Sequence, residues 1–340
     1  MTETPKSILI VGAGGFIGGF IAAEALRRGY DTTVGVRAST SRRYLTDPRL
    51  KFIEFDYDDP AAVRAAIESA PARWDYVIYN LGATKAPDFP TFNRVNFQYL
   101  RTVAGALTDA GRVPDKFLYM SSLSAIGPGD EKDYSPISEQ MTPRPNTRYG
   151  LSKVKSEQWL ETMSGLPWII FRPTGVYGPH EQDYLMMIKS IDSHFDFGVG
   201  FRRQMLTFIY VEDLVRAMLM ALEKAPVRRK YNISEPRAYS QAEFRRIVAR
   251  ELGRKAVLPV RLPLWAAGAV CTVAGKLSRF TGKTPTLNPD KFKIMKQRNW
   301  QCTTEAATAD FGFTAQVDLE EGIRRTVAAY RQQKQQPITK

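Results

Sequence analysis

A tyrosine and a lysine four positions apart, Tyr149 and Lys153, are the strongest candidates for chemistry in the sequence. On a helix, this spacing places a phenol and an ammonium on the same face. A nearby cation favours the phenolate and lowers the pKa of the tyrosine, which suits proton transfer near neutral pH. Tyr330 and Lys334 repeat the spacing near the polar C-terminal end, with no hydroxyl-bearing strand ahead of them. We interpret this second pair as incidental.

Hydroxyl side chains precede Tyr149 at the end of an apolar run. Ser121, Ser122 and Ser124 directly follow Lys116–Met120, which has the composition of a buried strand. Parallel sheets bind ligands at the carboxyl ends of their strands. We therefore expect these serines to lie near a ligand.

A glycine-rich segment, Gly12-Ala13-Gly14-Gly15-Phe16-Ile17-Gly18, follows the first apolar run and precedes a helical pattern. In this context Gly12 would make a tight turn, Gly15 would let the backbone approach a pyrophosphate, and Gly18 would let helix and strand pack closely. The N-terminus of the helix would add free N–H groups and positive potential. The segment predicts a dinucleotide site.

The second apolar run ends in Arg37, where proteins that bind NAD usually carry Asp or Glu for the ribose hydroxyls. Ser39, Arg42 and Arg43 follow within a few positions. Guanidinium and hydroxyl groups suit a 2′-phosphate. We therefore expect NADP(H) as the cofactor, in preference to NAD(H).

Short apolar runs alternate with helical patterns in the first half of the chain, which indicates βαβ units and a parallel sheet. The expected strands are Ser7–Val11, Thr32–Val36, Lys51–Phe55, Tyr76–Tyr79, Lys116–Met120 and Trp168–Phe171. The expected helices include Phe16–Arg28, Glu212–Lys224 and Gln241–Leu252. The predicted class is α/β, a Rossmann doubly wound parallel sheet with a smaller, mainly helical C-terminal lobe. Residues 1–172 would form the NADP-binding core, 173–331 a substrate lobe with some strands returning to the core, and 332–340 a polar tail.

Composition excludes several classes of protein. The 340 residues include two cysteines without CxxC spacing and two histidines that cannot form HExxH, so we expect no metal site.

The net charge of +13 fits either an ordinary surface or attraction to phosphates or an acidic membrane. Basic residues are scattered without a nucleic-acid motif, so we expect no nucleic-acid partner. The N-terminus lacks the pattern of a signal peptide, which favours a cytoplasmic location.

Together these motifs resemble the extended short-chain dehydrogenase/reductase family, also called the NAD-dependent epimerase/dehydratase family. The other matching segments are Asp56-Tyr57, Asn80-Leu81-Gly82-Ala83, Val95-Asn96, Arg172-Pro173-Thr174-Gly175-Val176-Tyr177-Gly178-Pro179 and Phe208-Ile209-Tyr210-Val211-Glu212-Asp213. Two positions depart from the family pattern. Arg37 replaces the usual acidic residue, and Leu123 replaces the acidic residue of sugar dehydratases, which argues against dehydration.

The resemblance implies hydride transfer between a nicotinamide and a carbonyl or carbinol carbon. Tyr149 would give or take the proton and Ser122 would bind the substrate oxygen. Lys153 would bind the nicotinamide ribose, and Asn96 would hold the proton-relay geometry. The cofactor contacts we expect are Gly12, Gly15, Phe16, Ile17, Gly18, Arg37, Ser39, Arg42, Asp56, Tyr57, Leu81, Gly82, Ala83, Tyr149, Lys153 and Pro173. The substrate contacts we expect are Ser122, Ser124, Thr84, Tyr177 and Arg202.

An uncharged stretch, Leu262–Gly275, lies between basic residues and is too short to span a bilayer. Two interpretations stay open: peripheral membrane contact through residues 261–283, or a buried helix that closes the second lobe. A similar apolar insertion occurs in the steroid-dehydrogenase-like and ketosphinganine-reductase-like branches of the family. The segment Asp290–Cys302 also resembles bacterial members of that group.

We therefore expect an NADP(H)-dependent reductase of a ketone on a hydrophobic, lipid-like substrate, with a 3-keto long-chain base of sphingolipid synthesis as the first specific hypothesis. One alternative is a nucleotide-sugar epimerase or reductase, in which Arg202 and Arg203 would hold a diphosphate. The other is a non-catalytic NADP-binding accessory subunit, against which the intact Ser122, Tyr149 and Lys153 argue. A peripheral position on the inner face of the membrane and a homodimer are both left open.

Overall fold

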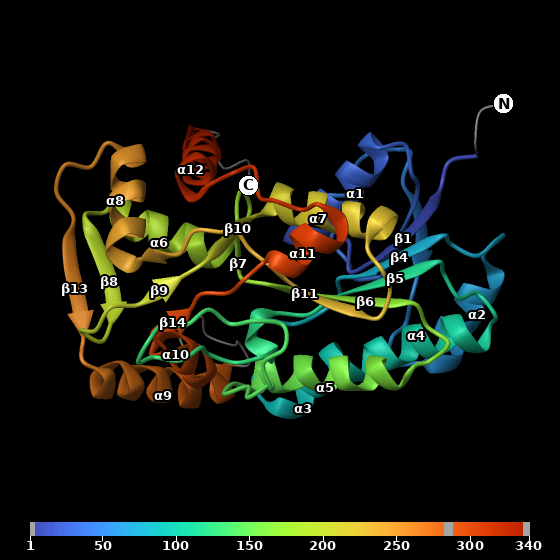
Figure 1. The fold of residues 1–340 in the computed structure, drawn as a ribbon, viewed down its shortest axis with the longest axis horizontal. Helices are drawn as coiled ribbons and strands as arrows, with labels where there is room; N and C mark the ends of the chain where they lie inside the picture. The colour runs from blue at the N-terminus through green and yellow to red at the C-terminus, as the bar shows by residue number, and fades with distance from the viewer. Residues whose placement is uncertain (1–3, 282–287, 336–340) are drawn as a thin grey trace.

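The computed structural model describes residues 4–281 and 288–335 of the chain (Figure 1). Its largest element is a seven-stranded sheet in which all neighbouring strands run parallel, in the order β11-β6-β5-β4-β1-β2-β3. The strands are β1 (Ser7–Val11), β2 (Asp31–Val36), β3 (Lys51–Glu54), β4 (Tyr76–Tyr79), β5 (Lys116–Met120), β6 (Trp168–Pro173) and β11 (Arg229–Ile233). The order reverses between β1 and β4, so the predicted doubly wound α/β class is confirmed.

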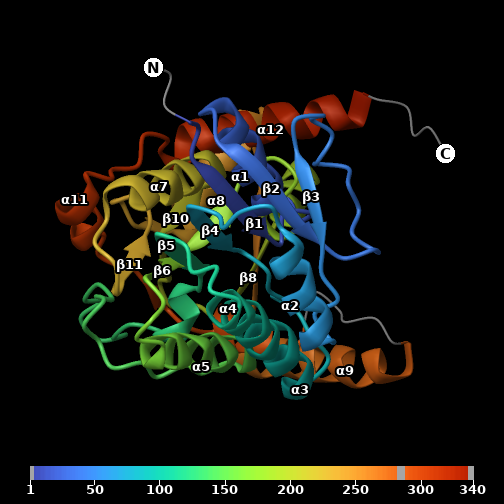
Figure 2. The same cartoon turned by 90° about the vertical axis from the view of Figure 1, so that its right-hand side faces the viewer.

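Helices cover both faces of this sheet (Figures 1 and 2). One face carries α1 (Phe16–Arg27), α7 (Val211–Lys224) and α11 (Glu305–Phe311), and the other carries α2 (Pro60–Ser69), α4 (Tyr99–Asp109) and α5 (Arg148–Thr162). Alternation along β1 shows why both faces are apolar: Ile8 and Ile10 join the core under α1 and α7, while Leu9 joins the core under α2 and α4. The seventh strand, β11, returns to this sheet from the second half of the chain.

The smaller lobe is built from short strands and helices around a separate apolar core (Figure 1). Its helices are α6 (Gln182–Asp192), α8 (Gln241–Leu252), α9 (Leu264–Thr281), α10 (Pro289–Met295) and α12 (Leu319–Gln335). Its strands form three small sheets: β7 (Gly175–Tyr177) with β10 (Phe208–Tyr210), β8 (Phe195–Val199) with β13 (Leu258–Leu262), and β9 (Met205–Leu206) between β12 (Tyr239–Ser240) and β14 (Asn299–Trp300). Two short helical segments, α3 (Phe89–Phe92) and the π-helical η1 (Asn93–Gln98), run directly into α4, and the turn η2 (Leu123–Ala125) follows β5.

The C-terminal segment differs from the prediction of a polar tail that starts at residue 332. Helix α12 continues to Gln335, and Tyr330 is buried against the smaller lobe with its hydroxyl 3.0 Å from the Asp192 carboxylate. Lys334 binds the same carboxylate at 2.7 Å. Tyr330 and Lys334 therefore have a structural role. None of the described helices is long and apolar enough to cross a membrane.

Candidate active site

The glycine-rich segment, which comprises the loop after β1 and the first turn of α1, contacts its neighbours too closely for side chains at Gly12 and Gly18. A Cβ on Gly12, whose φ is +87°, would lie 2.5 Å from the Leu81 nitrogen, and one on Gly18 would lie 2.3 Å from the Gly12 carbonyl oxygen. At Gly15 a Cβ would meet only the Gly12 oxygen, at 3.9 Å. Gly15 is also the N-cap of α1, so no side chain caps the first N–H groups of this helix. A dinucleotide pyrophosphate fits this cradle, which a side chain at Gly15 would fill.

The loop after β2 lies directly against the glycine loop. A Cβ on Gly14 would lie 2.3 Å from the Thr40 methyl carbon, and the Thr40 hydroxyl accepts a hydrogen bond from the Arg37 backbone. Arg37, Arg42 and the neighbouring hydroxyl of Ser39 are exposed. The Arg42 guanidinium stacks on the Phe52 ring at 4.4 Å, and neither arginine side chain binds an acidic group among the described residues. This end of the site is therefore rich in unneutralised positive charge.

Tyr57, which follows β3, was predicted to contact the cofactor, and this prediction is wrong for its side chain. Tyr57 is 4% exposed, and its ring stacks on Tyr99 with 5.3 Å between ring centroids. Asp56, by contrast, is exposed, and its carboxylate accepts from the Asp58 backbone. Both residues lie beyond the end of β3, and the turn at Tyr57 and Asp58 directs the ring towards the core. Only Asp56 of this pair can reach a cofactor with its side chain.

Helix α5 carries both Tyr149 and Lys153, as the spacing predicts. The Lys153 ammonium lies 6.0 Å from the centroid of the Tyr149 ring and donates a 2.7 Å hydrogen bond to the Met120 carbonyl at the end of β5. Burial lowers the pKa of Lys153 to about 7, against the opposing charge of Glu157.

The pKa of Tyr149 differs from the expectation. Burial raises it to about 12, and a hydrogen bond with Ser122 acts in the other direction. In the protein without a bound cofactor, the Lys153 ammonium does not lower the pKa of the Tyr149 hydroxyl, because it is turned towards the Met120 carbonyl. The Ser122 hydroxyl nevertheless lies close enough to Tyr149 to lower the pKa of its phenol, which agrees with the arrangement that the resemblance implies.

Asn96 is fully buried in η1, a π-helical turn, and joins two parts of the site. Its side-chain oxygen accepts from the Ala83 nitrogen at 2.7 Å, and its amide donates to the Ala83 carbonyl and to the Ser152 hydroxyl. A Cβ on Gly82 would lie 3.1 Å from the Lys153 nitrogen and 3.2 Å from the Asn96 oxygen. Asn96 therefore fixes the loop after β4 against the helix that carries Tyr149, which is the positioning role the resemblance implies.

A buried ion pair lies behind the serine cluster and was not anticipated. The Arg172 guanidinium binds the Glu157 carboxylate at 2.5 Å, and both side chains are almost completely buried. Ser121 donates a short hydrogen bond to the same carboxylate. Because these residues belong to β6, α5 and the end of β5, the pair holds the three elements that present Ser122 and Tyr149 in one arrangement.

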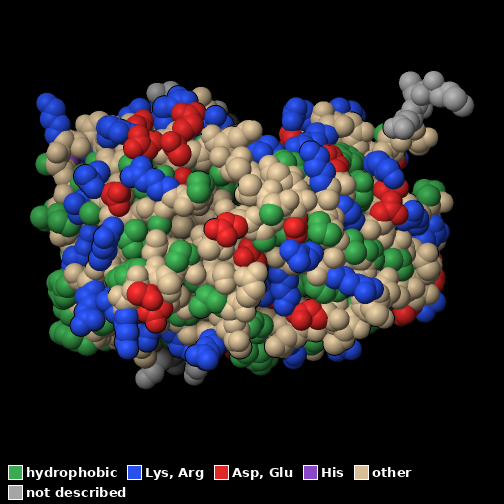
Figure 3. Space-filling view, in the orientation of Figure 1, with side chains coloured by type: hydrophobic (Ala, Val, Ile, Leu, Met, Phe, Trp, Pro, Cys, Tyr) green, Lys and Arg blue, Asp and Glu red, His purple; other side chains and the backbone are tan. Residues whose placement is uncertain are grey.

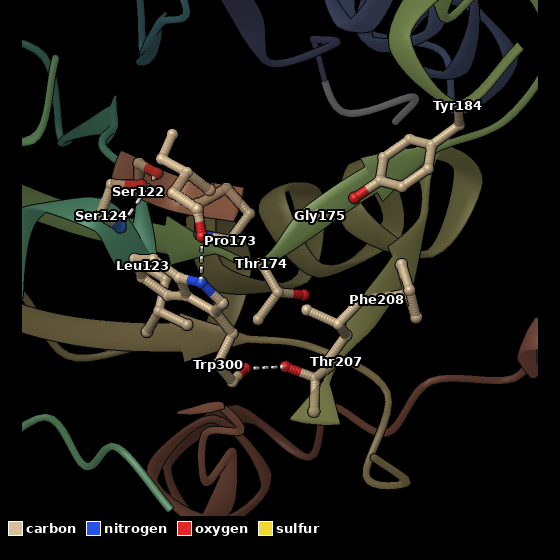
Figure 4. Close-up of a pocket in the computed structure, with 12 residues that line it drawn as sticks. Ser122, Leu123, Ser124, Pro173, Thr174, Gly175, Tyr184, Thr207, Phe208 and Trp300 are labelled. Carbon is tan, nitrogen blue, oxygen red and sulfur yellow. Dashed lines mark hydrogen bonds between the residues drawn. The ribbon is translucent and has the colours of Figure 1, made fainter. Parts of the chain in front are cut away.

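A cavity of about 170 Å³ opens next to Ser122 (Figure 4). It is lined by Ser122, Leu123, Ser124, Pro173, Thr174, Gly175, Tyr184, Leu206, Thr207, Phe208, Ile294 and Trp300. Figure 4 shows the Trp300 indole between Ser124 and Thr207, fixed by a hydrogen bond from its N–H to the Ile294 carbonyl. The lining is mostly apolar, with hydroxyls as its polar groups and no charged side chain among its members.

Three of the predicted substrate contacts do not line this cavity. Tyr177 is completely buried, and its hydroxyl donates to the Asp318 carbonyl at 3.2 Å, so it belongs to the core of the smaller lobe. Thr84 and Arg202 are exposed and lie outside the cavity lining. Ser122 and Ser124, by contrast, do line it.

Two residues of the cavity lining, Thr207 and Trp300, were not predicted from the sequence, because they come from distant parts of the chain. Thr207 precedes β10, and its hydroxyl donates to the Trp300 carbonyl at 2.9 Å. Trp300 lies on β14, which pairs with β9, a strand about 95 positions earlier in the chain. The aromatic residue at position 300 is visible in the sequence, but only the register of β14 with β9 places it at the site.

The arrangement suits transfer of a proton at a carbon–oxygen bond. When bound, a nicotinamide cofactor supplies or accepts the hydride. Ser122 can hold the reacting oxygen while the Tyr149 hydroxyl, beside it, gives or takes the proton. The buried ammonium of Lys153 lies beside Gly82 and Asn96, where it would bind a hydroxyl of the nicotinamide ribose. A Rossmann sheet with this serine, tyrosine and lysine defines a nicotinamide-dependent oxidoreductase.

Comparison with known proteins identifies the family. Residues 8–234 match the model of the NAD dependent epimerase/dehydratase family, which is more than half of the chain. The chain belongs to this family of extended short-chain dehydrogenases/reductases and is an enzyme. The UDP-glucose 4-epimerase of Vibrio cholerae is 22% identical over 97% of both chains, and that of Lactobacillus helveticus is 23% identical over 70% of this chain and 79% of its own.

Solved structures have the same fold. The UDP-glucose 4-epimerase of Thermotoga maritima, solved with UDP-glucose, has a TM-score of 0.78 at 21% identity and covers 97% of this chain and 100% of its own. That of Thermus thermophilus, in complex with NAD, has a TM-score of 0.77 at 21% identity and covers 96% and 99%. A nicotinamide dinucleotide is thus the cofactor of similar structures. These relatives fit the nucleotide-sugar alternative better than the lipid-ketone hypothesis.

Proposed function

We propose that the enzyme reduces a ketone to a secondary alcohol with NADP(H), on a substrate with an apolar group beside the reacting carbon. The cavity carries this proposal. Hydroxyl groups of Ser122 and Ser124 lie on the side near Tyr149, and apolar side chains such as Leu206, Phe208 and Trp300 form much of the remaining wall. The other hydroxyl groups in the lining belong to Thr174, Tyr184 and Thr207. A diphosphate placed there would find no cationic side chain among the lining residues, whereas a hydrocarbon chain would be removed from water.

The choice of NADP(H) rests on the loop after β2. Arg37 stands at the position that binds ribose hydroxyls, and Arg42 and Ser39 are exposed beside it. A carboxylate is absent from the end of β2, where it would repel a 2′-phosphate, and a guanidinium can bind that phosphate at two oxygens. The similar structures in complex with NAD support only the dinucleotide, so the preference for the phosphate is part of the proposal.

A second candidate, a nucleotide-sugar epimerase or reductase, is favoured by the relatives. Those named above are UDP-glucose 4-epimerases, and three of the four comparisons cover almost the whole chain. Under this hypothesis a nucleotide would extend beyond the cavity towards exposed basic residues such as Arg202 and Arg203.

Turnover assays separate the two candidates. The purified protein is mixed with NADPH and either a 2-amino-3-keto long-chain base, a ketosteroid or a UDP-4-keto sugar, and NADPH absorbance is followed. Epimerisation of UDP-glucose, which consumes no net cofactor, is followed separately by product analysis. We expect NADPH oxidation with an apolar ketone and none with the Tyr149→Phe variant. Oxidation with the UDP-keto sugar alone, or epimerisation of UDP-glucose, would replace the first candidate with the second.

A further inference from the structure

The two-stranded sheet of β8 and β13 turns its apolar side to the solvent. Side chains that pair across a parallel sheet point to the same face. The register pairs Phe195 with Leu258, Phe197 with Val260 and Val199 with Leu262, so one face of this sheet is entirely apolar. The exposed fractions are 43% for Phe195, 57% for Phe197 and 61% for Leu258.

The opposite face of the same sheet holds the charges. Asp196, between the two phenylalanines, is 3% exposed and forms ion pairs with Arg245 at 3.4 Å and Arg261 at 2.9 Å. The pair with Arg245 fixes the polar side of the sheet to α8, and the pair with Arg261 joins its two strands. The usual arrangement, with apolar side chains inward and polar ones outward, is therefore reversed here.

The apolar surface continues into the next loop and into α9. The Gly200 nitrogen donates to the Leu262 carbonyl at 2.8 Å, and a Cβ on Gly200 would lie 3.5 Å from the Leu264 side chain. Phe201 and Trp265 flank this contact and are 76% and 79% exposed. We call the whole surface the apolar face; its members are Phe195, Phe197, Val199, Phe201, Leu258, Val260, Leu262, Leu264 and Trp265. Figure 3 shows hydrophobic side chains at the end of the molecule that carries β13, β8 and α9, with Lys and Arg beside them.

Helix α9 contains most of the uncharged stretch Leu262–Gly275, and the burial of its side chains tests the two interpretations of that stretch. Ala267 and Cys271 are buried, and Gly268 packs against the Phe292 ring of α10, whereas Trp265 points into solvent. The helix is thus packed on one side only, and the interpretation as a fully buried helix is wrong for the described side chains of 264–274. The basic residues Lys276, Arg279 and Lys283 follow in the sequence, and their side chains lie outside the part of the chain that the structure describes.

Charge decides which partner fits the apolar face. Arg202 and Arg203 directly follow Phe201, and Lys255 precedes β13. All three are exposed, and no acidic group binds them in the part of the chain that the structure describes. A second copy seated on this face would bring like charges together, with +13 on each chain. An anionic lipid surface would instead attract the basic residues and receive the aromatic side chains.

We propose that the apolar face docks the enzyme onto the surface of an anionic lipid bilayer. Contiguous exposed apolar surface marks an interaction site, and aromatic side chains with a basic rim are the pattern of peripheral membrane binding. The face also connects to the catalytic site. Helix α9 packs on α10, and α10 contributes Ile294 to the cavity wall. Docking through the apolar face holds whether the substrate is a lipid ketone or a nucleotide sugar.

Co-sedimentation with vesicles tests the proposal on the full-length protein. We expect binding to vesicles of phosphatidylcholine with phosphatidylglycerol at low salt and partial release at high salt, because exposed charges are screened. The double substitution Phe197→Ser with Trp265→Ser should lower the partition coefficient by roughly tenfold or more. Both side chains are more than half exposed, so thermal unfolding should stay close to that of the unsubstituted protein.

A matched control is Phe52→Ser, which removes an exposed phenylalanine from β3 at the far edge of the seven-stranded sheet. It should leave vesicle binding unchanged. Tryptophan fluorescence gives a second measurement: vesicles with brominated lipid chains should quench emission from the unsubstituted protein but not from the Trp265→Phe variant. Absence of vesicle binding at low salt would overturn the proposal. So would a dimer, seen by light scattering, that the double substitution dissociates.

Discussion

The carboxylate of Asp290 caps the helix that carries Tyr149, although the two residues are 141 positions apart. One oxygen of Asp290 accepts hydrogen bonds from the backbone N–H groups of Arg148 at 3.0 Å and Tyr149 at 3.3 Å. Thr147 caps the same helix end through the Gly150 nitrogen. A negative charge at a helix N-terminus satisfies free donors and interacts favourably with the helix dipole. The first turn of α10 therefore helps to position Tyr149.

This contact predicts a loss of activity from Asp290→Ala. Removing the cap should cost about 1 kcal/mol of helix-end stability and lower kcat severalfold, because Tyr149 loses a fixed position. Asp290→Asn keeps an acceptor oxygen at the same place and should retain most of the activity. Steady-state kinetics of the two variants measure the effect. Equal activity of Asp290→Ala and the unsubstituted enzyme would show that Thr147 alone holds the helix end.

Replacing Tyr149 with Phe should lower turnover by roughly 10² or more, because only the proton-transferring oxygen is removed. Folding and NADPH binding should persist, as circular dichroism and cofactor titration can show. Tyr330→Phe is the matched control with the same Tyr-to-Lys spacing. It loses a hydrogen bond to Asp192 and about 1 kcal/mol of stability, but its catalytic rate should be unchanged. Normal ketone reduction by Tyr149→Phe would show that another group donates the proton.

Cofactor selectivity should depend on Arg37. We expect NADPH to bind at least tenfold more tightly than NADH, which corresponds to roughly 1.4 kcal/mol. Arg37→Asp should reverse this preference, since it removes a phosphate contact and adds a charge that repels the phosphate while accepting ribose hydroxyls. Fluorescence titration with both cofactors gives the two dissociation constants. Similar affinities in the unsubstituted protein would mean that Arg37 only solvates the surface.

Local patterns predicted the strands of the large sheet well, and they placed Tyr149 and Lys153 on one helix, as the structure shows. β1, β4 and β5 have the predicted bounds, since a short apolar run buried on both faces is hard to mistake. Helix α1 ends one residue before the predicted Arg28. β3 is the exception among the expected strands, because it lies at the sheet edge and is largely exposed rather than covered on both faces.

Contacts between distant segments could not be predicted. Trp300 reaches the cavity only because β14 pairs with β9, and a two-residue strand leaves no periodic signal in the sequence. Tyr177 lies in a family motif, but its hydroxyl binds the Asp318 carbonyl in the core, which only tertiary packing determines. The exposed side of β8 was missed for a related reason: alternation marks two faces of a strand without saying which one is covered.

A buried carboxyl group in the smaller lobe predicts that stability depends on pH. Glu235 is 2% exposed; one oxygen accepts from the Tyr239 hydroxyl at 3.0 Å and from the Leu319 nitrogen at 3.1 Å. Its other oxygen is buried without a hydrogen-bond partner among the described residues. Burial raises the pKa of Glu235 to about 8 from an ordinary value of 4.5.

Because the folded pKa of Glu235 is raised, its contribution to stability is complete below pH 4.5 and is lost as pH rises through 8. Glu235→Gln should remove this slope and make the protein more stable at pH 8, by up to a few kcal/mol. Glu243→Gln is the control, since the pKa of Glu243 is lowered and it titrates below this range. Urea unfolding from pH 5 to 8 measures the slopes, and an unchanged slope in Glu235→Gln would contradict the assignment.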